Sequence, residues 1–266
     1  MANESLRIAM IGCGNLGSAI VQRWMASGTL QPDQIVACTA TEASATRVRA
    51  QLGVAVSQNL AEALRGTDVA ILAFKPQQRQ AILPQLAAVG VRPLWISLLA
   101  GAQFGELTAA LGPRVIRWMP NTPVAVGAGV TAQCAGPEVS GADHATATAL
   151  ATALGTVVEV TEANYDAFAA VAGCGPAYVY AFCEALAAAG VAQGLDPALA
   201  AQIARQTVVG AGQLLGQSAE SAAALREKVT SKGGMTAAAL ATLGTAGWEG
   251  LLADAVAAAV ARARGL

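Results

Sequence analysis

The stretch LRIAMIGCGNLG, residues 6–17, decides the fold of this chain. It opens with a run of apolar residues that is typical of a buried parallel strand. Three glycines follow, Gly12, Gly14 and Gly17, and a helical pattern then continues to about residue 27. A second apolar run, QIVAC at 34–38, completes a strand–helix–strand unit of about 30 residues. In this context the glycine pattern predicts a βαβ unit that binds a dinucleotide.

Each glycine of the expected turn has its own physical role. The first allows the chain to turn, the second lets the backbone approach a pyrophosphate, and the third lets helix and strand pack closely. Unpaired N–H groups and the positive end of the helix dipole then face the phosphates. We therefore expect the cofactor to be bound by Gly12, Gly14, Asn15, Leu16 and Gly17.

The end of the second strand bears on which dinucleotide binds. NAD sites commonly place an Asp or Glu there to accept hydrogen bonds from the ribose. Here the strand ends in CTAT, residues 38–41, and the nearest acid, Glu42, has the spacing of a helix capping box with Thr39. The 2′-phosphate of NADP would meet no carboxylate; the two threonines are candidate donors to it, and Arg47 or Arg49 is a candidate cation. The sequence favours NADPH, with NADH as the alternative.

The alternation of strand-like and helical patterns continues to about residue 160. We expect strands at 6–11, 34–38, 54–56, 69–74, 94–99, 115–119, 126–136 and 156–160, with helices between them. This order predicts a Rossmann-type α/β domain, a parallel sheet with helices on both faces. The β pattern then stops, and Ala/Leu-rich helical patterns follow. We place the Rossmann domain at 1–162 and an all-helical domain at 163–266.

Composition limits the classes of partner. Charged residues make up only 12% of the 266 residues and the net charge is −1, so we expect no nucleic acid and no membrane partner. The apolar stretch Ala167–Cys183 is interrupted by glycine and proline, and we interpret it as soluble core. So little charge on Ala-rich helices predicts that a second copy covers them in a homodimer.

Cysteine and histidine usage points to a cytoplasmic protein without a metal site. The five cysteines are odd in number, none stands in a C-x-x-C pair, and no secretory signal is evident, so we expect reduced thiols in the cytoplasm. His144 is the only histidine, and no suitably spaced ligands or triad partners accompany it. We expect no bound metal.

A second motif, VTSKGGMT at 229–236, lies between two expected helices. Two hydroxyl residues precede two glycines, and a helix should begin near Met235. Free backbone N–H groups together with the Ser231 hydroxyl would suit a small anion such as a carboxylate. An interhelical turn with a serine cap explains the same residues, so the motif alone leaves both interpretations open.

Five motifs, taken in order, resemble the pyrroline-5-carboxylate reductase family: GCGNLG, LAFKPQ (72–77), MPNTPVAVGAG (119–129), AGCGPAYVYAFCEAL (172–186) and VTSKGGMT. The resemblance covers almost the whole chain. It implies reduction of the cyclic imine 1-pyrroline-5-carboxylate to L-proline by hydride transfer from NAD(P)H, the last step of proline biosynthesis. It also implies a helical domain that binds substrate and interlocks with a second subunit, in homodimers that assemble further.

The resemblance also assigns roles to single residues. Ser231, Gly233, Gly234 and Met235 would hold the substrate carboxylate, and Thr236 would contact the imine nitrogen as the catalytic residue. A neutral hydroxyl is a weak acid, so we interpret Thr236 as positioning the nitrogen or a proton-delivering water. Further cofactor-binding residues that the resemblance implies, besides Thr39, are Asn59, Ala73, Lys75, Pro76 and Asn121.

Two positions depart from the family's pattern. The family often has Arg shortly after the second strand, where this chain has Ala40, and this departure weakens the NADP assignment. It often has Pro in the substrate loop, where Lys232 stands here. A lysine there changes either the rigidity of the loop or the charge beside the carboxylate site.

Two other functions stay open at the level of sequence. A related imine or 3-hydroxyacid reductase acting on another substrate would share the two-domain plan. In 3-hydroxyacid-type enzymes a lysine of the helical domain does the catalysis, and Lys228 and Lys232 are the lysines of that half of the chain. A non-catalytic dinucleotide-binding protein would leave the VTSKGGMT motif unexplained.

Overall fold

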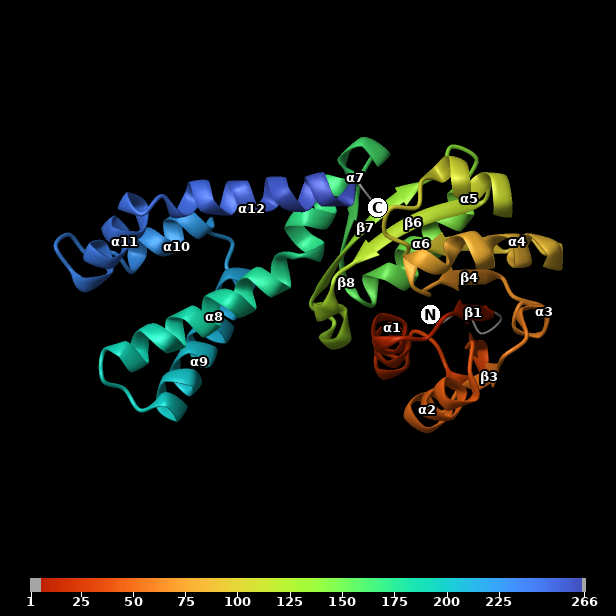
Figure 1. Ribbon diagram of the computed structural model, residues 1–266, viewed down its shortest axis with the longest axis horizontal. Helices are drawn as coiled ribbons and strands as arrows, with labels where there is room; N and C mark the ends of the chain where they lie inside the picture. The colour runs from red at the N-terminus through yellow and green to blue at the C-terminus, as the bar shows by residue number, and fades with distance from the viewer. Residues whose placement is uncertain (1–5, 265–266) are drawn as a thin grey trace. The chain divides into compact units, whose positions relative to one another are not determined.

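The computed structural model describes residues 6–264 and divides into two compact units (Figure 1). Of the described residues, the first unit comprises 6–173 with 260–264, and the second comprises 174–259. Helix α7 (Glu162–Phe168) begins where the β pattern ends, yet it belongs to the first unit. The domain boundary at 162/163 stays a prediction.

The first unit is built on a sheet that has eight strands within residues 6–264, in the order β3-β2-β1-β4-β5-β6-β7-β8 (Figure 1). The strands from β1 to β6 are mutually parallel. The Rossmann-type prediction is confirmed. The strand bounds are β1 Ile8–Ile11, β2 Ile35–Cys38, β3 Ala55–Ser57, β4 Val69–Leu72, β5 Leu94–Ser97, β6 Val115–Pro120, β7 Gly129–Ala135 and β8 Gly155–Glu159.

The edge of the sheet formed by β6, β7 and β8 is not uniformly parallel. Strand β7 runs antiparallel to β6, and β8 runs parallel to β7. Residues 121–128 connect β6 to β7 and contain only the 3₁₀ turn Thr122–Val126. A parallel crossover needs about a dozen residues, usually with a helix, so this short connection returns the chain antiparallel. Helix α6 (Gly141–Thr152) then provides the crossover from β7 to β8.

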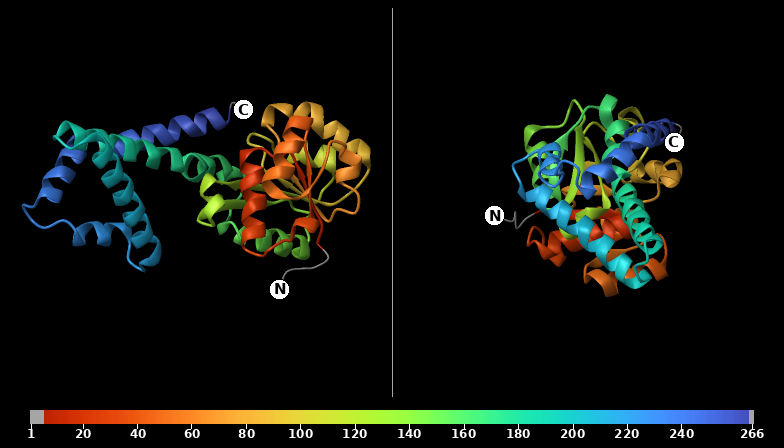
Figure 2. Two further views of the ribbon diagram at one scale, coloured as in Figure 1. Left: turned by 90° about the horizontal axis from the view of Figure 1, so that it is seen from below. Right: turned by 90° about the vertical axis from the view of Figure 1, so that its left-hand side faces the viewer.

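Alternate residues of each central strand face two different cores, which is why the strands are continuously apolar. Ile8 and Met10 of β1 face one core, and Ala9 and Ile11 face the other. Helices lie on both faces of the sheet (Figure 2). One core includes residues of α1 (Asn15–Ala26), α2 (Glu42–Leu52) and α6 (Gly141–Thr152); the other includes residues of α3 (Leu60–Ala63), α4 (Arg79–Val89) and α5 (Phe104–Leu111).

The start of α2 corrects one expectation. The N-cap of α2 is Thr41, whose hydroxyl accepts a hydrogen bond from the Ser44 N–H at 3.3 Å. Glu42 instead forms an ion pair with Arg49 at 2.9 Å. The expected capping box between Thr39 and Glu42 is therefore wrong. Thr39 lies at the end of β2 and is only 5% exposed.

A buried cation fixes the last part of the first unit. The guanidinium of Arg117, on β6, lies 3.9 Å from the ring centroid of Tyr165 on α7 and 2.7 Å from Glu162. Burial raises the pKa of the Tyr165 hydroxyl above its usual range, so this side chain stays neutral beside the cation. The cluster holds α7 against the sheet, and a π-helical turn, Ala169–Gly173, follows directly.

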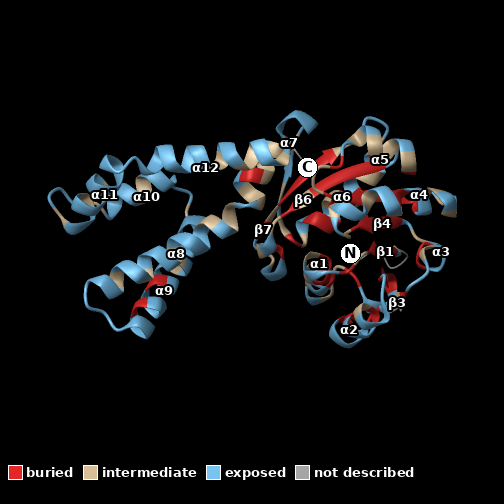
Figure 3. Cartoon of the chain, in the orientation of Figure 1, coloured by how far each residue is buried: buried red, intermediate tan, exposed pale blue. Residues whose placement is uncertain are grey.

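The second unit is all-helical, but its side chains remain largely uncovered (Figure 3). Among its described residues only Ala200 and Ala204 are buried. The expectation that Ala167–Cys183 is core is therefore wrong for most of this stretch in a single chain, although Ala170 is buried. The helices of this unit are α8 Gly175–Ala192, α9 Pro197–Gln217, α10 Ala222–Lys228, α11 Met235–Thr245 and most of α12 Trp248–Ala263.

One helical stretch within the described residues, Glu162–Ala192, is long and apolar enough to cross a membrane by length and composition alone. It consists of two helices separated by the π-helical turn, and Pro176 stands in the first turn of α8. Exposed large apolar side chains also occur on α9 and α12, where no such stretch exists, for example Leu214 and Leu251. The uncovered apolar surface is thus a property of the whole helical unit.

Candidate functional site

A cavity of about 520 Å³ opens at the carboxyl ends of β1, β2 and β4. Strand β1 lies between β2 and β4, so the strand order reverses at this point. Open parallel sheets bind their ligands in the crevice at such a switch point. The lining residues are Ile11, Gly12, Cys13, Gly14, Cys38, Thr39, Ala40, Ser44, Arg47, Gln58, Leu60, Ala73, Phe74, Lys75, Gln78, Ile82 and Gln85.

The three glycines of the turn have the separate roles that the motif predicts. Gly12 has φ +84°, and a Cβ there would lie 2.6 Å from the backbone nitrogen of Phe74. A Cβ on Gly17 would lie 3.1 Å from the carbonyl oxygen of Gly12. A Cβ on Gly14 would meet no atom within 4 Å, although Gly14 lines the cavity and caps α1. The space beside Gly14, at a helix N-terminus, fits a pyrophosphate.

The ionic charges on the cavity wall are all positive. The lining includes Arg47 and Lys75 and no carboxylate. Glu42 accepts hydrogen bonds from Arg49 and Gln58, and the Arg49 hydrogen bond holds the pKa of Glu42 below its ordinary value. A wall of this kind suits a polyanionic dinucleotide.

The two thiols of the cavity are not suited to nucleophilic chemistry. Burial raises the pKa of both Cys13 and Cys38, so both remain protonated near neutral pH. Cys13 lies 3.5 Å from the Ser18 hydroxyl, and Gly12 donates its N–H to the Cys38 carbonyl at 2.8 Å. These two residues support the glycine turn.

The structure brings together most of the residues expected to bind the cofactor. Thr39, Ala73 and Lys75 line the cavity with Gly12 and Gly14, and Ala73 donates its N–H to the Ile11 carbonyl at 2.8 Å. The rest of the glycine motif, Asn15, Leu16 and Gly17, forms the first turn of α1. Pro76 begins a 3₁₀ turn directly after Lys75.

Other lining residues escaped the sequence reasoning. Phe74, Gln58 and Gln78 face the cavity, and each lies within three residues of a position that was expected to bind. Asn59 itself caps α3, because its Oδ1 accepts from the Glu62 N–H at 3.1 Å. The adjacent Gln58 reaches the cavity instead. A useful signal would have been the position of Gln58 directly after β3 and of Phe74 two residues after β4, because both lie at the carboxyl ends of strands.

Asn121 lies at the carboxyl end of β6, and its amide joins two segments of backbone. Its Oδ1 accepts from the Val130 N–H at 2.9 Å, and its Nδ2 donates to the Ala172 carbonyl at 3.0 Å. Ala172 belongs to the π-helical turn that leads into α8. Asn121 therefore holds this turn at the carboxyl edge of the sheet, where the cavity also opens, but Asn121 does not line that cavity. Its expected role in cofactor binding stays a prediction.

In the second unit, the VTSKGGMT motif forms a tight turn between α10 and α11. The Gly234 N–H donates to the Ser231 carbonyl at 3.0 Å, and Gly233 has φ +74°. These values describe a type II turn, with Lys232 at the position where proline is favoured. A Cβ on Gly234 would collide with the Ser231 hydroxyl. The turn thus requires glycine at position 233, whereas a side chain at position 234 would require the Ser231 hydroxyl to rotate away.

The loop also presents the open end of a helix. Gly234 is the N-cap of α11 and provides no side-chain cap, so the first N–H groups of α11 are available to an anion. Met235 is 92% exposed, and Thr236 stands beside it in the first turn. The Thr230 hydroxyl donates to the Arg226 carbonyl at 2.6 Å, which leaves Ser231 and Thr236 as the hydroxyls of interest.

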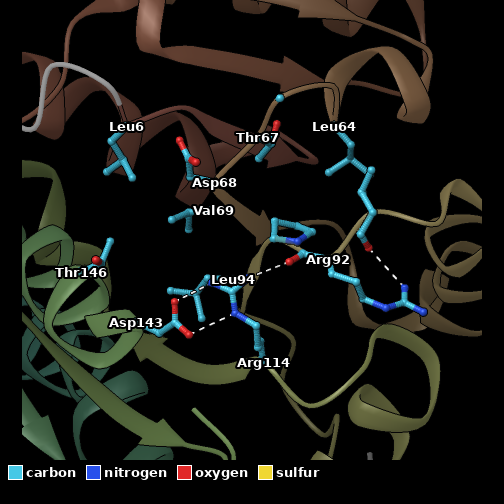
Figure 4. Close-up of a pocket in the computed structure, with 13 residues that line it drawn as sticks. Leu6, Leu64, Thr67, Asp68, Val69, Arg92, Leu94, Arg114, Asp143 and Thr146 are labelled. Atoms are coloured by element: carbon cyan, nitrogen blue, oxygen red, sulfur yellow. Dashed lines mark hydrogen bonds and ion pairs between the residues drawn. The ribbon is translucent and has the colours of Figure 1, made fainter. Parts of the chain in front are cut away.

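A second cavity of about 420 Å³ lies at the opposite edge of the sheet, beside the amino ends of β1, β4 and β5 (Figure 4). Its Arg114 pairs with both carboxylate oxygens of Asp143, at 2.6 and 3.1 Å, and also donates to the Arg92 carbonyl at 2.8 Å. These contacts join the segments before β5 and β6 to helix α6, at the edge that open parallel sheets do not use for ligands. We interpret this cavity as structural.

The fold and the cavity define a nicotinamide-dependent oxidoreductase of the Rossmann type. A family model described as NADP oxidoreductase coenzyme F420-dependent matches residues 7–101, and one described as pyrroline-5-carboxylate reductase dimerisation matches residues 162–266. The pyrroline-5-carboxylate reductase of Synechocystis is 39% identical over 98% of each chain, and that of Pseudomonas aeruginosa is 35% identical over 96% of this chain and 95% of its own. The chain belongs to the pyrroline-5-carboxylate reductase family.

Solved structures agree with this assignment. The pyrroline-5-carboxylate reductase of Coxiella burnetii superposes with a TM-score of 0.91 at 32% identity and 98% coverage of both chains. The enzyme of Plasmodium falciparum, solved with NADP bound, superposes with a TM-score of 0.86 at 26% identity and 98% coverage of both chains.

Separate substitutions of Gly12 and Gly14 should distinguish an effect on stability from an effect on cofactor binding. Gly12→Ala places a methyl group against the backbone of Phe74 at a positive φ, and we expect it to lower the free energy of unfolding by about 2–5 kcal/mol. Gly14→Val should melt near the wild-type temperature but lose NADPH affinity, because its side chain fills the cavity. Thermal melts and NADPH fluorescence titrations measure both. A Gly14→Val variant with unchanged NADPH affinity would show that the turn does not hold the pyrophosphate.

Proposed function

We propose that this protein reduces 1-pyrroline-5-carboxylate to L-proline with NADPH, the last step of proline biosynthesis, as a cytoplasmic homodimer. The observation that best supports this proposal is that a chain of this family has two features together. One is a cavity at the switch point of the sheet whose charged lining residues are all cationic, and the other is the VTSKGGMT turn at the start of α11. NADH is the alternative cofactor. A non-catalytic dinucleotide-binding protein would have no need of the second feature.

The turn before α11 supplies the substrate anchor in this proposal. The free N–H groups at the start of α11 and the Ser231 hydroxyl bind the carboxylate of the imine, with Gly233 and Gly234 allowing the close backbone approach. Thr236, in the first turn, forms a hydrogen bond to the imine nitrogen or to a water beside it. This contact orients the C=N bond and stabilises the nitrogen as its charge changes.

The first unit holds the nicotinamide cofactor, which supplies the hydride when it is bound. Gly12, Gly14 and the N-terminus of α1 bind the pyrophosphate, and Ala73, Lys75 and Pro76 follow β4 toward the nicotinamide ribose. We keep Asn59 as a candidate for binding the adenosine side of the cofactor, because its neighbour Gln58 lines the cavity. Asn121 keeps the π-helical turn in place at the nicotinamide edge of the sheet.

A homodimer accounts for the uncovered helices. The unit that exposes Tyr180, Leu214 and Leu251 is the unit that the dimerisation model of the family matches. Apolar faces of this extent are stable in water when a second copy covers them. A further assembly of such dimers is compatible with the same surface. We propose no membrane and no nucleic-acid partner, because the exposed apolar surface extends beyond the one membrane-length stretch and the net charge is −1.

We propose the cytoplasm as the compartment. All five cysteines are free, and three of them, Cys13, Cys38 and Cys134, are buried. Burial raises the pKa of each of these three thiols and keeps them protonated. Free thiols in this number are typical of a reducing compartment.

The activity itself is tested by following NADPH oxidation with 1-pyrroline-5-carboxylate. We expect turnover that needs both compounds, with a higher kcat/KM for NADPH than for NADH. Linear 3-hydroxy acids with NADP⁺ should give no comparable rate. Faster turnover of a 3-hydroxy acid or of an unrelated imine would assign the protein to a different reaction, and NADPH binding without any turnover would favour a non-catalytic role.

Thr236→Ala and Ser231→Ala should affect different kinetic constants. The Thr236 hydrogen bond is worth most as the nitrogen changes charge, about 1.5–3 kcal/mol, so its loss should lower kcat by roughly 10- to 150-fold. Ser231→Ala should act mainly by raising KM for the imine, because it weakens the carboxylate anchor. Steady-state kinetics with parallel melting curves separate these effects from stability. A Thr236→Ala variant that melts earlier yet keeps its kcat/KM would reduce the residue to a structural role.

The dimer is tested by placing a charge on the exposed helical surface. Leu251 on α12 is 66% exposed, and we expect Leu251→Asp to dissociate the dimer at micromolar concentration and to lower activity. Val126→Asp is the matched control, because Val126 is 74% exposed but belongs to the first unit. Light scattering after size exclusion gives the mass of each variant. A wild-type protein that is a stable monomer would contradict the proposal.

A further inference from the structure

Two arginines of α2 have the same charge but different surroundings. Arg47 lines the cofactor cavity, and its Nη2 donates to the Cys13 carbonyl of the glycine turn at 2.8 Å. Arg49 is two positions further along the helix, so its side chain points about 200° away around the axis. Its Nη1 pairs with Glu42 at 2.9 Å, and it does not line the cavity. One arginine of the pair is thus turned to the cavity and the other is neutralised outside it.

The end of the cavity near α2 is lined by small and polar groups. Thr39 and Ala40 follow β2, and Ser44 lies in the first turn of α2, one helical turn before Arg47. Ala40 has only a methyl side chain, so the space beside the end of β2 is left open. Gln58 completes this wall and also donates to Glu42. The Glu42 carboxylate is therefore committed to Arg49 and Gln58. The Glu62 carboxylate, whose charge acts on Cys38, accepts a hydrogen bond from the Ser57 hydroxyl at 2.6 Å.

The contact with Cys13 orients the guanidinium without exhausting its donors. A guanidinium has five N–H donors in a planar fork. Arg47 uses one for the Cys13 carbonyl, and a second lies 3.4 Å from Gln51. The remaining donors can pair with a phosphate, and the fixed plane reduces the entropy lost on binding. Cys13 belongs to the glycine turn that binds the pyrophosphate in the proposed function. The same backbone segment therefore positions both the pyrophosphate and the Arg47 guanidinium.

We propose that Arg47 is the residue that distinguishes NADPH from NADH in this protein, by pairing with the 2′-phosphate on the adenine ribose. Thr39 and Ser44 assist it with their hydroxyls. Ala40, the second residue after β2, cannot do so, because it carries no polar group. Lys75, the other cation of the wall, follows β4 and not β2. This inference rests on the proposed function, because it requires a dinucleotide in the cavity.

The test is direct binding rather than turnover. The dissociation constants of NADPH and NADH are measured by fluorescence titration for the wild type, Arg47→Ala, Arg47→Gln and the matched control Arg49→Ala. We expect Arg47→Ala to weaken NADPH by about 10- to 100-fold and to leave NADH within about two-fold, since a charge-assisted pair is lost only with the phosphorylated cofactor. Arg47→Gln keeps an amide donor for the Cys13 carbonyl and should also lose the preference. Arg49→Ala should retain it.

The fragments 2′,5′-ADP and 5′-ADP provide an independent readout as competitors of NADPH. The wild type should prefer 2′,5′-ADP, and both Arg47 variants should not. If the Arg47 variants weaken NADPH and NADH equally, Arg47 only supports the glycine turn and the inference is overturned while the dinucleotide site stands. An equal loss of preference in Arg49→Ala would overturn it as well. A wild type that binds neither dinucleotide would refute the proposed function itself.

Discussion

The close approach of Gly12 to the backbone at the end of β4 is the constraint on which the cofactor half of this protein depends. Only a residue without a side chain can lie there, because a Cβ would come within 2.6 Å of the Phe74 nitrogen. The approach lets Ala73 donate to the Ile11 carbonyl, so the chain leaves β1 and β4 side by side. The glycine turn and the residues after β4 consequently form two walls of one cavity.

Cations in the first unit have distinct tasks, and the partner of each decides which. Arg117 is 3% exposed, lies over an aromatic ring and pairs with Glu162, so it holds α7 to the sheet. Arg114 pairs with Asp143 at the edge of the sheet away from the cofactor cavity. Arg47 lines the cavity and donates to the Cys13 carbonyl and to the Gln51 amide, so no carboxylate neutralises its charge. Among these three arginines, a carboxylate partner thus distinguishes the two structural ones from the one that we assign to binding.

The stability of the helical unit depends on the covering of its exposed side chains. It forms regular helices, a type II turn and an open helix N-terminus, yet within its described residues only two alanines are buried. Hydrophobic burial is the main favourable contribution to folding, so a unit with so little of it gains its stability by association. The substrate turn, the helix that follows it and the surface for a second copy all belong to this unit. Substrate binding and assembly are therefore coupled in the function that we propose.

Local patterns in the sequence were sufficient for the strands, the helices and the glycine turn, because apolar periodicity and the need for glycine at positive φ act over a few residues. The end of the second strand pointed to Thr39, and the family resemblance pointed to Ala73 and Lys75; all three line the cavity. Only the tertiary structure decided that Thr41 rather than Thr39 caps α2, that β7 returns antiparallel, and that Asn121 bonds to Val130 and Ala172. It alone distinguished Arg47 from Arg49. The physical reason is the same in each case: the partner of a polar side chain depends on which distant segments the fold brings beside it.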